Sequence, residues 1–517
     1  MSLRVVPSPI PHDVTAAALA AARDAQLAVA GPALPAEAFL ATGQAERNLA
    51  TLLGGGALTV TTGQQAGLFA GPLYVVEKAL TAAALAQRLT EAWGTPVVPV
   101  FWVAGDDHDF AEIASCAVMG QAGEPVRVVL RERPAAAPMH PAFRELLGGD
   151  VAPALERLEG ALPASEFRGG VLEWLRAAYR PDASMADAFA QAVAALMGEH
   201  GVVVLRGWHP AAKRAVDAVF RGALERAGEL DGLLAAEAEA LRASGREAPV
   251  GVGDGLALVM VEGKAGRDRL RILDAGAFET RRGGERFAAG ELAGVLRDDA
   301  ERLSANVLLR PVVESALVRS VAYVGGPGEL SYLPQARPLF AALGVPRPVP
   351  VPRSSGVLVD ARTEKTLTRL GLTVDDLAAS EQQVASRVLR DALPPSATAA
   401  LEAARRSVTE SFAALSSEAG AIDATLARPV EAARNQALAA TNDLEKRLVA
   451  ALKRSSETAV QQVVRARAAV RPGGEPQERV YALASFSARY GPEVVALLSS
   501  AAREHAATLL EGTPRGA

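Results

Sequence analysis

One segment of the chain leaves few choices of fold, because residues 57–105 read as a strand, a glycine-rich loop, a helix and a second strand. Residues 57–62 (ALTVTT) form a short β-branched run, and residues 72–91 read as a helix with Pro72 in its first turn. Residues 96–105 (PVVPVFWVAG) are a continuous apolar run between turn residues, which is typical of a strand buried on both faces of a parallel sheet. The segment therefore predicts a β-α-β unit.

Further strands are predicted at residues 202–206, 256–261, 320–324 and 349–351, with helical patterns and loops between them. This alternation favours the α/β class, with a doubly wound, Rossmann-like parallel sheet over residues 1–375. The wide gaps near residues 120–200 and 262–305 predict insertions that carry their own helices or small strands. We expect these insertions to act as lids or dimer contacts.

The last third of the chain predicts an α-helical coiled-coil arm over residues 376–471. A heptad seam is formed by Val408, Phe412, Leu415, Ala419, Ile422 and Leu426. Pro429 fits the first turn of a second helix, whose apolar row is Leu444, Leu448 and Leu452, and one kinked helix is the alternative. Residues 472–517 return to a compact amphipathic helical pattern, and we expect them to pack on the core.

Composition excludes several classes of function. The 54 basic and 59 acidic residues give a formal net charge of -5, so no basic field attracts nucleic acid. No apolar run is long enough for a membrane span, and the first residues (MSLRVVPSPIPHD) have no apolar signal core, so we expect a cytoplasmic protein. Cys116 is the only cysteine, which rules out an intrachain disulfide and a cysteine metal cluster and predicts a buried structural thiol.

Two motifs follow the strands of the β-α-β unit. Residues 62–74 (TGQQAGLFAGPLY) can bring backbone N–H groups close to an anion, although the loop lacks the lysine of a P-loop and also fits a tight structural turn. Residues 105–110 (GDDHDF) place three carboxylates around His108 at the end of a strand, where ligands of open α/β sheets bind. The Asp-His-Asp spacing suits an acid–base pair or a metal, and the alternative is a solvated loop that caps the next helix. Substrate binding is favoured over a permanent metal site.

Two later motifs also place polar or charged residues after a predicted strand. Residues 306–315 (NVLLRPVVES) precede residues 322–335 (AYVGGPGELSYLPQ), which read as strand, glycine turn and helix start. Residues 349–355 (VPVPRSS) end in an arginine and two hydroxyls that are able to clamp a phosphate or a carboxylate. Lys78, Arg310, Arg319 and Arg353 are the candidate cations, each with the alternative of an ordinary surface salt bridge.

The wording and order of these motifs resemble the bacillithiol-biosynthesis cysteine ligase family (BshC). The resemblance runs nearly end to end and includes residues 186–205 and 473–498. It implies a core similar to class I aminoacyl-tRNA synthetases and nucleotidyltransferases, with connecting-peptide insertions and a dimerising coiled coil. It also implies a ligase that joins the carboxyl group of cysteine to the amine of glucosaminyl-malate, in the last step of bacillithiol synthesis.

The resemblance also implies which residues form the site. The catalytic cluster would be Asp107, His108 and Asp109. Substrate or nucleotide would be bound by Gly63, Gln64, Gln65, Gly67, Gly71, Pro72, Tyr74, Asn306, Arg310, Gly325, Gly326, Glu329, Tyr332, Arg353, Ser354 and Ser355. We expect the loop at residues 63–72, the GDDHD turn and residues 325–329 to converge on one pocket at the carboxyl edge of the sheet.

Forming an amide from a free carboxylate in water is uphill, so the implied reaction needs a nucleotide. ATP is expected as the cofactor, with Mg²⁺ as its counter-ion, and either an adenylate or an acyl phosphate meets the chemical requirement. Cysteine and glucosaminyl-malate are the expected substrates, and a homodimer through the coiled coil is the expected assembly. The alternatives are a non-catalytic dimer that binds a nucleotide or metabolite, and a nucleotidyltransferase that acts on another small molecule.

Overall fold

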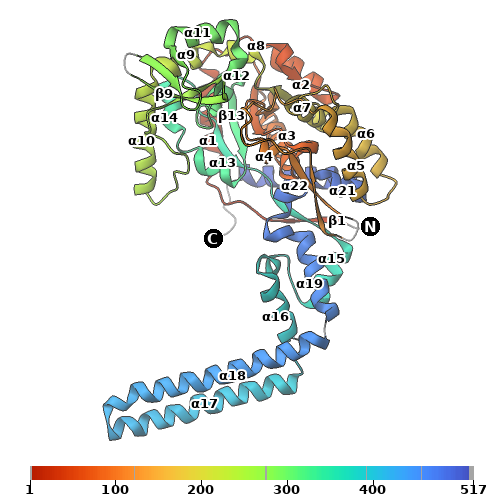
Figure 1. Ribbon diagram of the computed structural model, residues 1–517, viewed down its shortest axis with the longest axis vertical. Helices are drawn as coiled ribbons and strands as arrows, with labels where there is room; N and C mark the ends of the chain where they lie inside the picture. Colours follow the sequence, from red (N-terminus) through yellow and green to blue (C-terminus); the bar gives the residue numbers. More distant parts are fainter. Residues whose placement is uncertain (1–2, 121–122, 274–275, 392, 456, 512–517) are drawn as a thin grey trace. The chain divides into compact units, whose positions relative to one another are not determined.

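The structure is a computed structural model that describes residues 3–511 except 121–122, 274–275, 392 and 456, and the side chains of residues 452–455 are outside the described part. The chain divides into two compact units (Figure 1). One contains Leu3–Leu358 together with the chain from Gln477 onward, and the other is Val359–Pro476. The boundary that the sequence suggested near residue 376 falls inside the second unit.

The first unit is built around a six-stranded sheet of order β14-β13-β3-β4-β7-β2. Five of its strands are parallel: β14 (Val349–Pro352), β13 (Ser320–Gly325), β3 (Leu58–Gln64), β4 (Val97–Val103) and β7 (Val203–Arg206). The edge strand β2 (Phe39–Leu40) pairs antiparallel with β7. Helix α3 (Tyr74–Trp93) connects β3 to β4, so the predicted β-α-β unit and the α/β class are confirmed.

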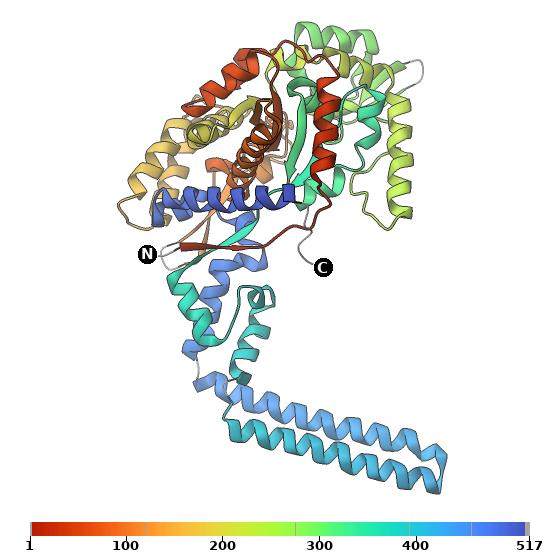
Figure 2. The ribbon, with the colours of Figure 1, turned by 180° about the vertical axis from the view of Figure 1, so that it is seen from behind.

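The burial of strand β4 on both faces of the sheet explains why its sequence is apolar throughout. Successive side chains of a strand point to opposite faces of the sheet. Val97, Phe101 and Val103 enter one hydrophobic core, and Val98, Val100 and Trp102 enter the other. Helices α1 (Ala16–Leu27), α3 and α22 (Glu493–Glu511) pack together on the first face, as Figure 2 shows. Helices α2 (Gln44–Leu53), α9 (Asp217–Glu225) and α12 (Arg310–Val318) supply the second core.

A second sheet of five strands is antiparallel, with the order β11-β10-β9-β8-β12. Its strands are β8 (Leu256–Gly263), β9 (Gly266–Ile272), β10 (Ala277–Thr280), β11 (Arg286–Ala288) and β12 (Leu303–Ala305). The prediction that residues 256–261 belong to the parallel sheet is therefore wrong. An apolar run indicates that a strand is buried, and β8 is indeed buried against α9 and α10 (Ala227–Ala243). Such a run does not indicate whether the strand pairs in a parallel or an antiparallel direction.

The remaining elements of this unit surround the two sheets. Residues 110–197 form α4 (Phe110–Ile113), the hairpin of β5 (Ser115–Met119) and β6 (Pro125–Val129), and helices α5 (Val151–Ala161), α6 (Arg168–Ala178) and α7 (Met185–Met197). Beyond β7 and β8 come α8 (Pro210–Ala215), α11 (Ala289–Asp298), α13 (Pro327–Tyr332) and α14 (Arg337–Ala342). The C-terminal segment forms α20 (Gln477–Val480), α21 (Leu483–Tyr490) and α22.

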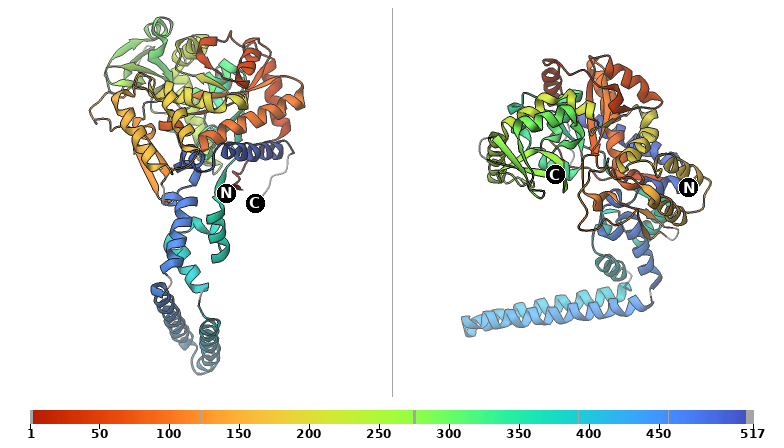
Figure 3. Two further views of the ribbon diagram at one scale, coloured as in Figure 1. Left: turned by 90° about the vertical axis from the view of Figure 1, so that its right-hand side faces the viewer. Right: turned by 45° about the horizontal axis from the view of Figure 1, so that its top comes forward.

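The second unit consists of helices. Helices α15 (Ala361–Leu370) and α16 (Glu381–Asp391) pack against α19 (Glu457–Val470). Helices α17 (Pro395–Ile422) and α18 (Ala427–Ser455) form a long pair that lies side by side in every view (Figures 1 and 3). The two predicted long helices are confirmed, with Pro429 in the first turn of α18. The side chain of Leu452 lies outside the described residues.

Within the described part of the chain, no helix combines the length and the hydropathy that crossing a membrane requires.

Candidate active site

A cavity of about 590 Å³ lies at the carboxyl ends of the five parallel strands. Its lining includes Gln65 after β3, Asp106 after β4, Gly207 after β7, Gly326 after β13 and Arg353 after β14. Because parallel strands end at one edge of the sheet, segments that are far apart in the sequence meet here. The predicted convergence of the loop after β3, the GDDHD turn and the segment after β13 is confirmed.

The structure brings most of the predicted site residues together. Those that line this cavity are Gly63, Gln64, Gln65, Tyr74, Asp107, His108, Asn306, Arg310, Gly326, Glu329, Tyr332 and Arg353. Gly67 and Pro72 line a smaller neighbouring cavity. The residues that line neither are Gly71, Asp109, Gly325, Ser354 and Ser355. Asp109 instead caps α4, accepting a hydrogen bond from the N–H of Glu112 at 3.2 Å.

The loop after β3 has a strained backbone that the rest of the fold holds in place. Phe69, Ala70 and Gly71 have positive φ values of 51°, 67° and 70°. Each of the two non-glycine residues costs about 1–3 kcal/mol in this conformation. The buried Tyr179 hydroxyl accepts a hydrogen bond from the N–H of Ala70 at 2.7 Å and donates one to the carbonyl of Gly67 at 2.9 Å. The loop is thus fixed before any ligand arrives.

The two adjacent glutamines of this loop serve different halves of the cavity. The Gln65 amide donates to Asp107 Oδ2 at 2.7 Å. The Gln64 side chain accepts from Lys78 Nζ at 2.8 Å and donates to the Tyr74 hydroxyl at 3.0 Å. Neighbouring residues at the end of a strand point in opposite directions, which explains this division.

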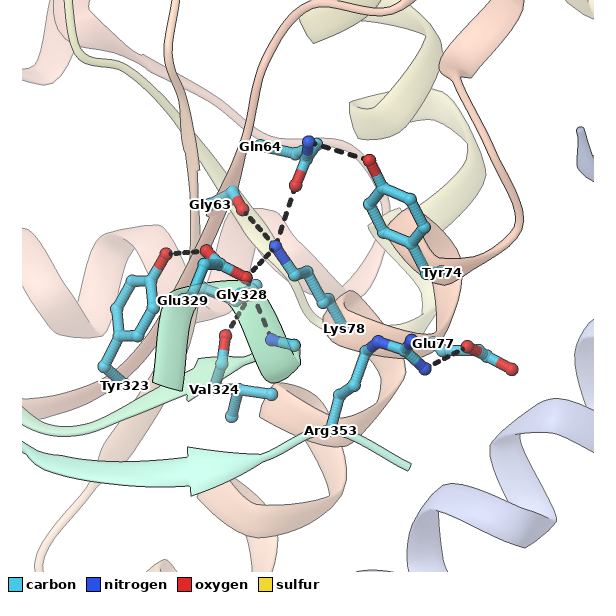
Figure 4. Close-up of polar contacts among 12 residues, drawn as sticks. Gly63, Gln64, Tyr74, Glu77, Lys78, Tyr323, Val324, Gly328, Glu329 and Arg353 are labelled. Carbon is cyan, nitrogen blue, oxygen red and sulfur yellow. Dashed lines mark hydrogen bonds and ion pairs between the residues drawn. The ribbon is translucent and has the colours of Figure 1, made fainter. Parts of the chain in front are cut away.

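One half of the cavity is organised by a buried ion pair between Lys78 and Glu329 (Figure 4). Lys78 Nζ also donates to the carbonyl of Gly63 at 2.9 Å. Burial lowers the pKa of Lys78, against the opposing effect of Glu329. Burial alone would raise the pKa of Glu329, but Lys78, the Tyr323 hydroxyl and the Gly326 N–H lower it below its usual value. Glu329 is therefore a carboxylate, held by donors on several sides.

The other half is organised by Asp107, His108 and a residue from the antiparallel sheet, Arg267 on β9. The Arg267 side chain is 9% exposed. Its Nη1 lies 3.1 Å from His108 Nδ1, its Nε donates to Ser304 Oγ at 2.8 Å, and its Nη2 donates to the carbonyl of Ala305 at 2.7 Å. These contacts fix the guanidinium directly beside the imidazole.

This contact determines the chemical form of His108. A guanidinium has only donors, so Nδ1 of His108 must accept, and the neutral ring carries its proton on Nε2. Burial and the Arg267 charge lower the pKa of His108, although Asp107 acts in the opposite direction. Burial would raise the pKa of Asp107, yet Arg267 and Gln65 lower it. The arrangement presents a neutral imidazole that donates from Nε2, next to an ionised carboxylate.

Sequence reasoning missed four cations of this cavity, one of which is Arg479 on α20. Lys213 on α8 is 2% exposed and pairs with Asp106 at 2.8 Å. Arg267 and Arg269 lie on β9, and the buried Nε of Arg269 has no hydrogen-bond partner among the described residues. The alternating arginines of residues 266–272 (GRDRLRI) were the available sign, because a period of two places them on one face of a strand.

We expect the Arg267→Met variant to raise the pKa of His108, because it removes the adjacent positive charge while Asp107 and Asp109 remain. Nitrogen-15 NMR of labelled histidine should follow the titration and show a growing Nδ1-protonated population. Arg271→Met is the matched control, since Arg271 lies on the same strand but faces Glu279 at 3.8 Å. An unchanged His108 titration in Arg267→Met would contradict the assigned tautomer.

Cys116 is 7% exposed, and burial raises the pKa of its thiol to about 12. The prediction of a buried structural thiol is confirmed. Among the described residues, no group of three or more His, Cys, Asp and Glu side chains is arranged to hold a metal ion.

Comparisons with known proteins agree with the fold and the motifs. Residues 35–354 match the family described as Bacillithiol biosynthesis BshC, N-terminal Rossmann-like domain, and residues 356–508 match the corresponding C-terminal coiled-coil domain. A protein of Salinibacter ruber named "Putative cysteine ligase BshC" is 32% identical over 460 residues, which is 88% of this chain and 83% of that protein. Proteins with the same name from Symbiobacterium thermophilum and Solibacter usitatus are 31% and 30% identical, over 85% of this chain and 80% and 82% of their own lengths. The chain belongs to the bacillithiol biosynthesis BshC family.

Proposed function

We propose that this protein is a ligase that joins the carboxyl group of cysteine to the amine of glucosaminyl-malate and so forms an amide bond. The relatives' name supports the ligase assignment. The structural observation that carries the proposal is a single cavity in which carboxylates and buried cations face the same space. Such a site suits two substrates that each bear charges of both signs. We also propose a cytoplasmic location, where ATP is available.

ATP is the proposed source of energy, with Mg²⁺ as its counter-ion. Seven cationic side chains line the cavity, and four of them are paired with carboxylates: Lys78, Lys213, Arg310 and Arg353. Among the described residues, Arg267, Arg269 and Arg479 form no salt bridge, and three such guanidiniums suit a polyphosphate. The unpartnered Nε of Arg269 supports this assignment, because a buried donor without a partner is costly and a bound anion would satisfy it. ATP would supply the activation of the carboxyl group that makes amide formation downhill.

The chain's own residues would then bind and orient the reacting groups. In this proposal the Glu329 carboxylate binds the ammonium group of cysteine. The Nε2–H of His108 donates a hydrogen bond to the carbonyl oxygen on which negative charge develops as the amine attacks. Asp107 holds the loop after β3 through Gln65. The cavity walls position both substrates, which is a large part of the catalysis of a bimolecular reaction.

The test is an assay with the purified full chain, cysteine, glucosaminyl-malate and ATP. Mass spectrometry should detect a product whose mass equals the sum of the two substrates minus one water. Consumption of ATP should require both substrates, and the nucleotide released identifies the mode of activation. Binding of all three compounds without any product would favour a non-catalytic binding protein instead.

We further propose that the protein forms a homodimer through α17 and α18. Leu415 and Ile422 on α17 are 51% and 80% exposed, and Leu444 on α18 is 53% exposed. Large apolar side chains along a long helix pair are typical of a surface that a second copy covers. A two-fold partner would present the same side chains, so one contact completes the burial for both copies.

Light scattering should give the mass of a dimer for the wild type and of a monomer for the Leu415→Asp, Ile422→Asp double variant, because buried carboxylates would oppose association. The matched control is Ser416→Asp with Ser417→Asp, which adds the same charge at exposed polar positions. A monomeric wild type would refute the homodimer. A dimer that persists in the double variant would place the contact on another surface.

A further inference from the structure

A second cavity of about 370 Å³ adjoins the first, and the proposed mechanism has not used it. The two cavities share the wall residues Gln64, Gln65, Tyr74, Glu112 and Arg479. The second cavity continues between the loop after β3, strand β5 and the start of the C-terminal segment. One end of a ligand bound in the second cavity would therefore lie at the wall that separates it from the first cavity.

Three charged side chains line this second cavity: Glu112 on α4, Arg127 on β6 and Arg479 on α20. Arg127 Nε donates to Ser115 Oγ on β5 at 3.1 Å. The side chain of Arg479 is placed at the same cavity by two backbone hydrogen bonds, which are formed by residues shortly after it in the chain. The N–H of Ala482 donates to the carbonyl of Ala117 on β5 at 2.8 Å, and the carbonyl of Tyr481 accepts from the N–H of Leu73 at 2.8 Å.

All three of these charged side chains are exposed to solvent. Among the described residues, neither Arg127 nor Arg479 forms a salt bridge, whereas Arg353 and Arg310 of the first cavity are both paired with buried glutamates. The charge of Arg479 acts on Glu112 and on Tyr74, so its guanidinium lies near the wall that the cavities share. Two guanidiniums with free donors beside one carboxylate are complementary to a ligand with two negative charges and one positive charge.

We propose that the second cavity is the subsite of the amine substrate and that it selects an amine that carries two carboxylates. Arg127 and Arg479 each bind one carboxylate, and Glu112 binds the ammonium group at the shared wall. The proposal rests on the proposed function, because that function requires an amine acceptor that meets the activated cysteine. It adds the side chains that recognise the acceptor and the direction from which the acceptor enters.

The placement of Glu112 explains how the amine is presented. The partial loss of hydration at Glu112 raises its pKa, and the neighbouring Asp109 and Asp107 act in the same direction, although Gln65 and Arg479 oppose them. A carboxylate with a raised proton affinity next to an ammonium group is able to accept the proton that the nitrogen must lose before its lone pair attacks the carbonyl carbon. The electron pair of the bond that breaks leaves with the activating group, and this anionic group takes the second proton, which the nitrogen loses once the amide bond has formed.

The test measures binding with two probes that need no turnover, L-malate and L-aspartate, by isothermal titration calorimetry on the full chain. L-Malate presents two carboxylates without an amine, and L-aspartate adds the ammonium group. Arg479→Gln and Arg127→Gln should each weaken both probes roughly 10- to 100-fold, as expected for a lost charged hydrogen bond. Glu112→Gln should weaken L-aspartate but not L-malate.

The matched control is Arg176→Gln, which removes the same charge from an exposed pair with Glu159. The proposed subsite is overturned by either of two results: L-malate does not bind the wild type, or it binds the two arginine variants as tightly as it binds the control. L-Aspartate binding that Glu112→Gln leaves unchanged overturns the role of Glu112. Probe binding that follows these expectations, without amide product from glucosaminyl-malate, would instead contradict the proposed function, so the two failures are distinguishable.

Discussion

The Arg353→Met variant is expected to lose about 3–5 kcal/mol of unfolding free energy, the usual result of removing one partner from a buried ion pair. The Arg353 side chain is 3% exposed and forms ion pairs with both Glu77 and Glu478. Methionine replaces most of the volume but leaves two buried carboxyl groups without a counter-charge. Burial already raises the pKa of Glu77, and nearby Glu478 raises it further, so the pair depends strongly on this one cation.

The effect should also depend on pH. A carboxyl group whose folded-state pKa is raised above its unfolded value stabilises the fold below the unfolded pKa and loses that contribution as the pH rises through the folded pKa. Without Arg353 the pKa of Glu77 rises further, so the loss should be smaller at about pH 5 than at about pH 8. Urea unfolding of the variant at both pH values measures this difference.

Arg337→Met is the matched control for this measurement. Arg337 pairs with Glu237 at 2.7 Å but is 61% exposed, and such surface pairs contribute about 0–1 kcal/mol. A loss in Arg353→Met no larger than in Arg337→Met would show that the two buried carboxyl groups do not depend on Arg353 for their stability in the fold. The role of Arg353 in holding the C-terminal segment would then be minor.

This ion pair illustrates what sequence reasoning was unable to reach. Residues 353–355 were predicted to bind a nucleotide, and Arg353 does line the cavity. Its guanidinium is nevertheless occupied by Glu77 and Glu478, and the Ser355 hydroxyl donates to Glu478 Oε2 at 2.8 Å. Arginine and serine side chains are able to bind either a phosphate or a buried carboxylate, so the residue types alone do not distinguish the two. Only the fold reveals that Glu478, 125 positions away, reaches this point.

The convergence of Gln65 and Asp107 was predictable for a physical reason. Gln65 directly follows β3, and Asp107 lies four positions after the end of β4. The apolar sequences of these strands predict parallel neighbours, and parallel neighbours end at one edge. Arg267 and Lys213 reach the same cavity from β9 and α8, which lie in segments outside the parallel sheet. Their positions depend on how those segments pack over the strand ends, and local periodicity contains no information on that packing.

The largest functional effect is expected from His108→Ala, which should lower amide formation by at least about 100-fold, as the loss of a donor to a developing oxyanion does. His108→Gln should recover part of the activity, because its amide N–H is able to donate in place of Nε2–H. Such recovery distinguishes a hydrogen-bond donor from a general base, since the amide of glutamine does not accept a proton at neutral pH. Product formation by mass spectrometry and the cellular content of bacillithiol are the two measurements.

Asp107→Asn separates the charge of Asp107 from its structural role. Asp107 Oδ1 accepts hydrogen bonds from the N–H of His108 at 2.6 Å and of Asp109 at 3.2 Å, and an asparagine oxygen is able to keep both. The turn should therefore persist. The thermal transition should stay close to that of the wild type, because the side chains of His108 and Asp107 are 22% and 32% exposed and do not belong to the core. The substitution removes the negative charge that acts on Arg267 and His108, and it should reduce product formation to a similar degree as His108→Ala. A large fall in the thermal transition of either variant would show that the cluster stabilises the fold, and full activity of Asp107→Asn would show that its charge has no part in the reaction.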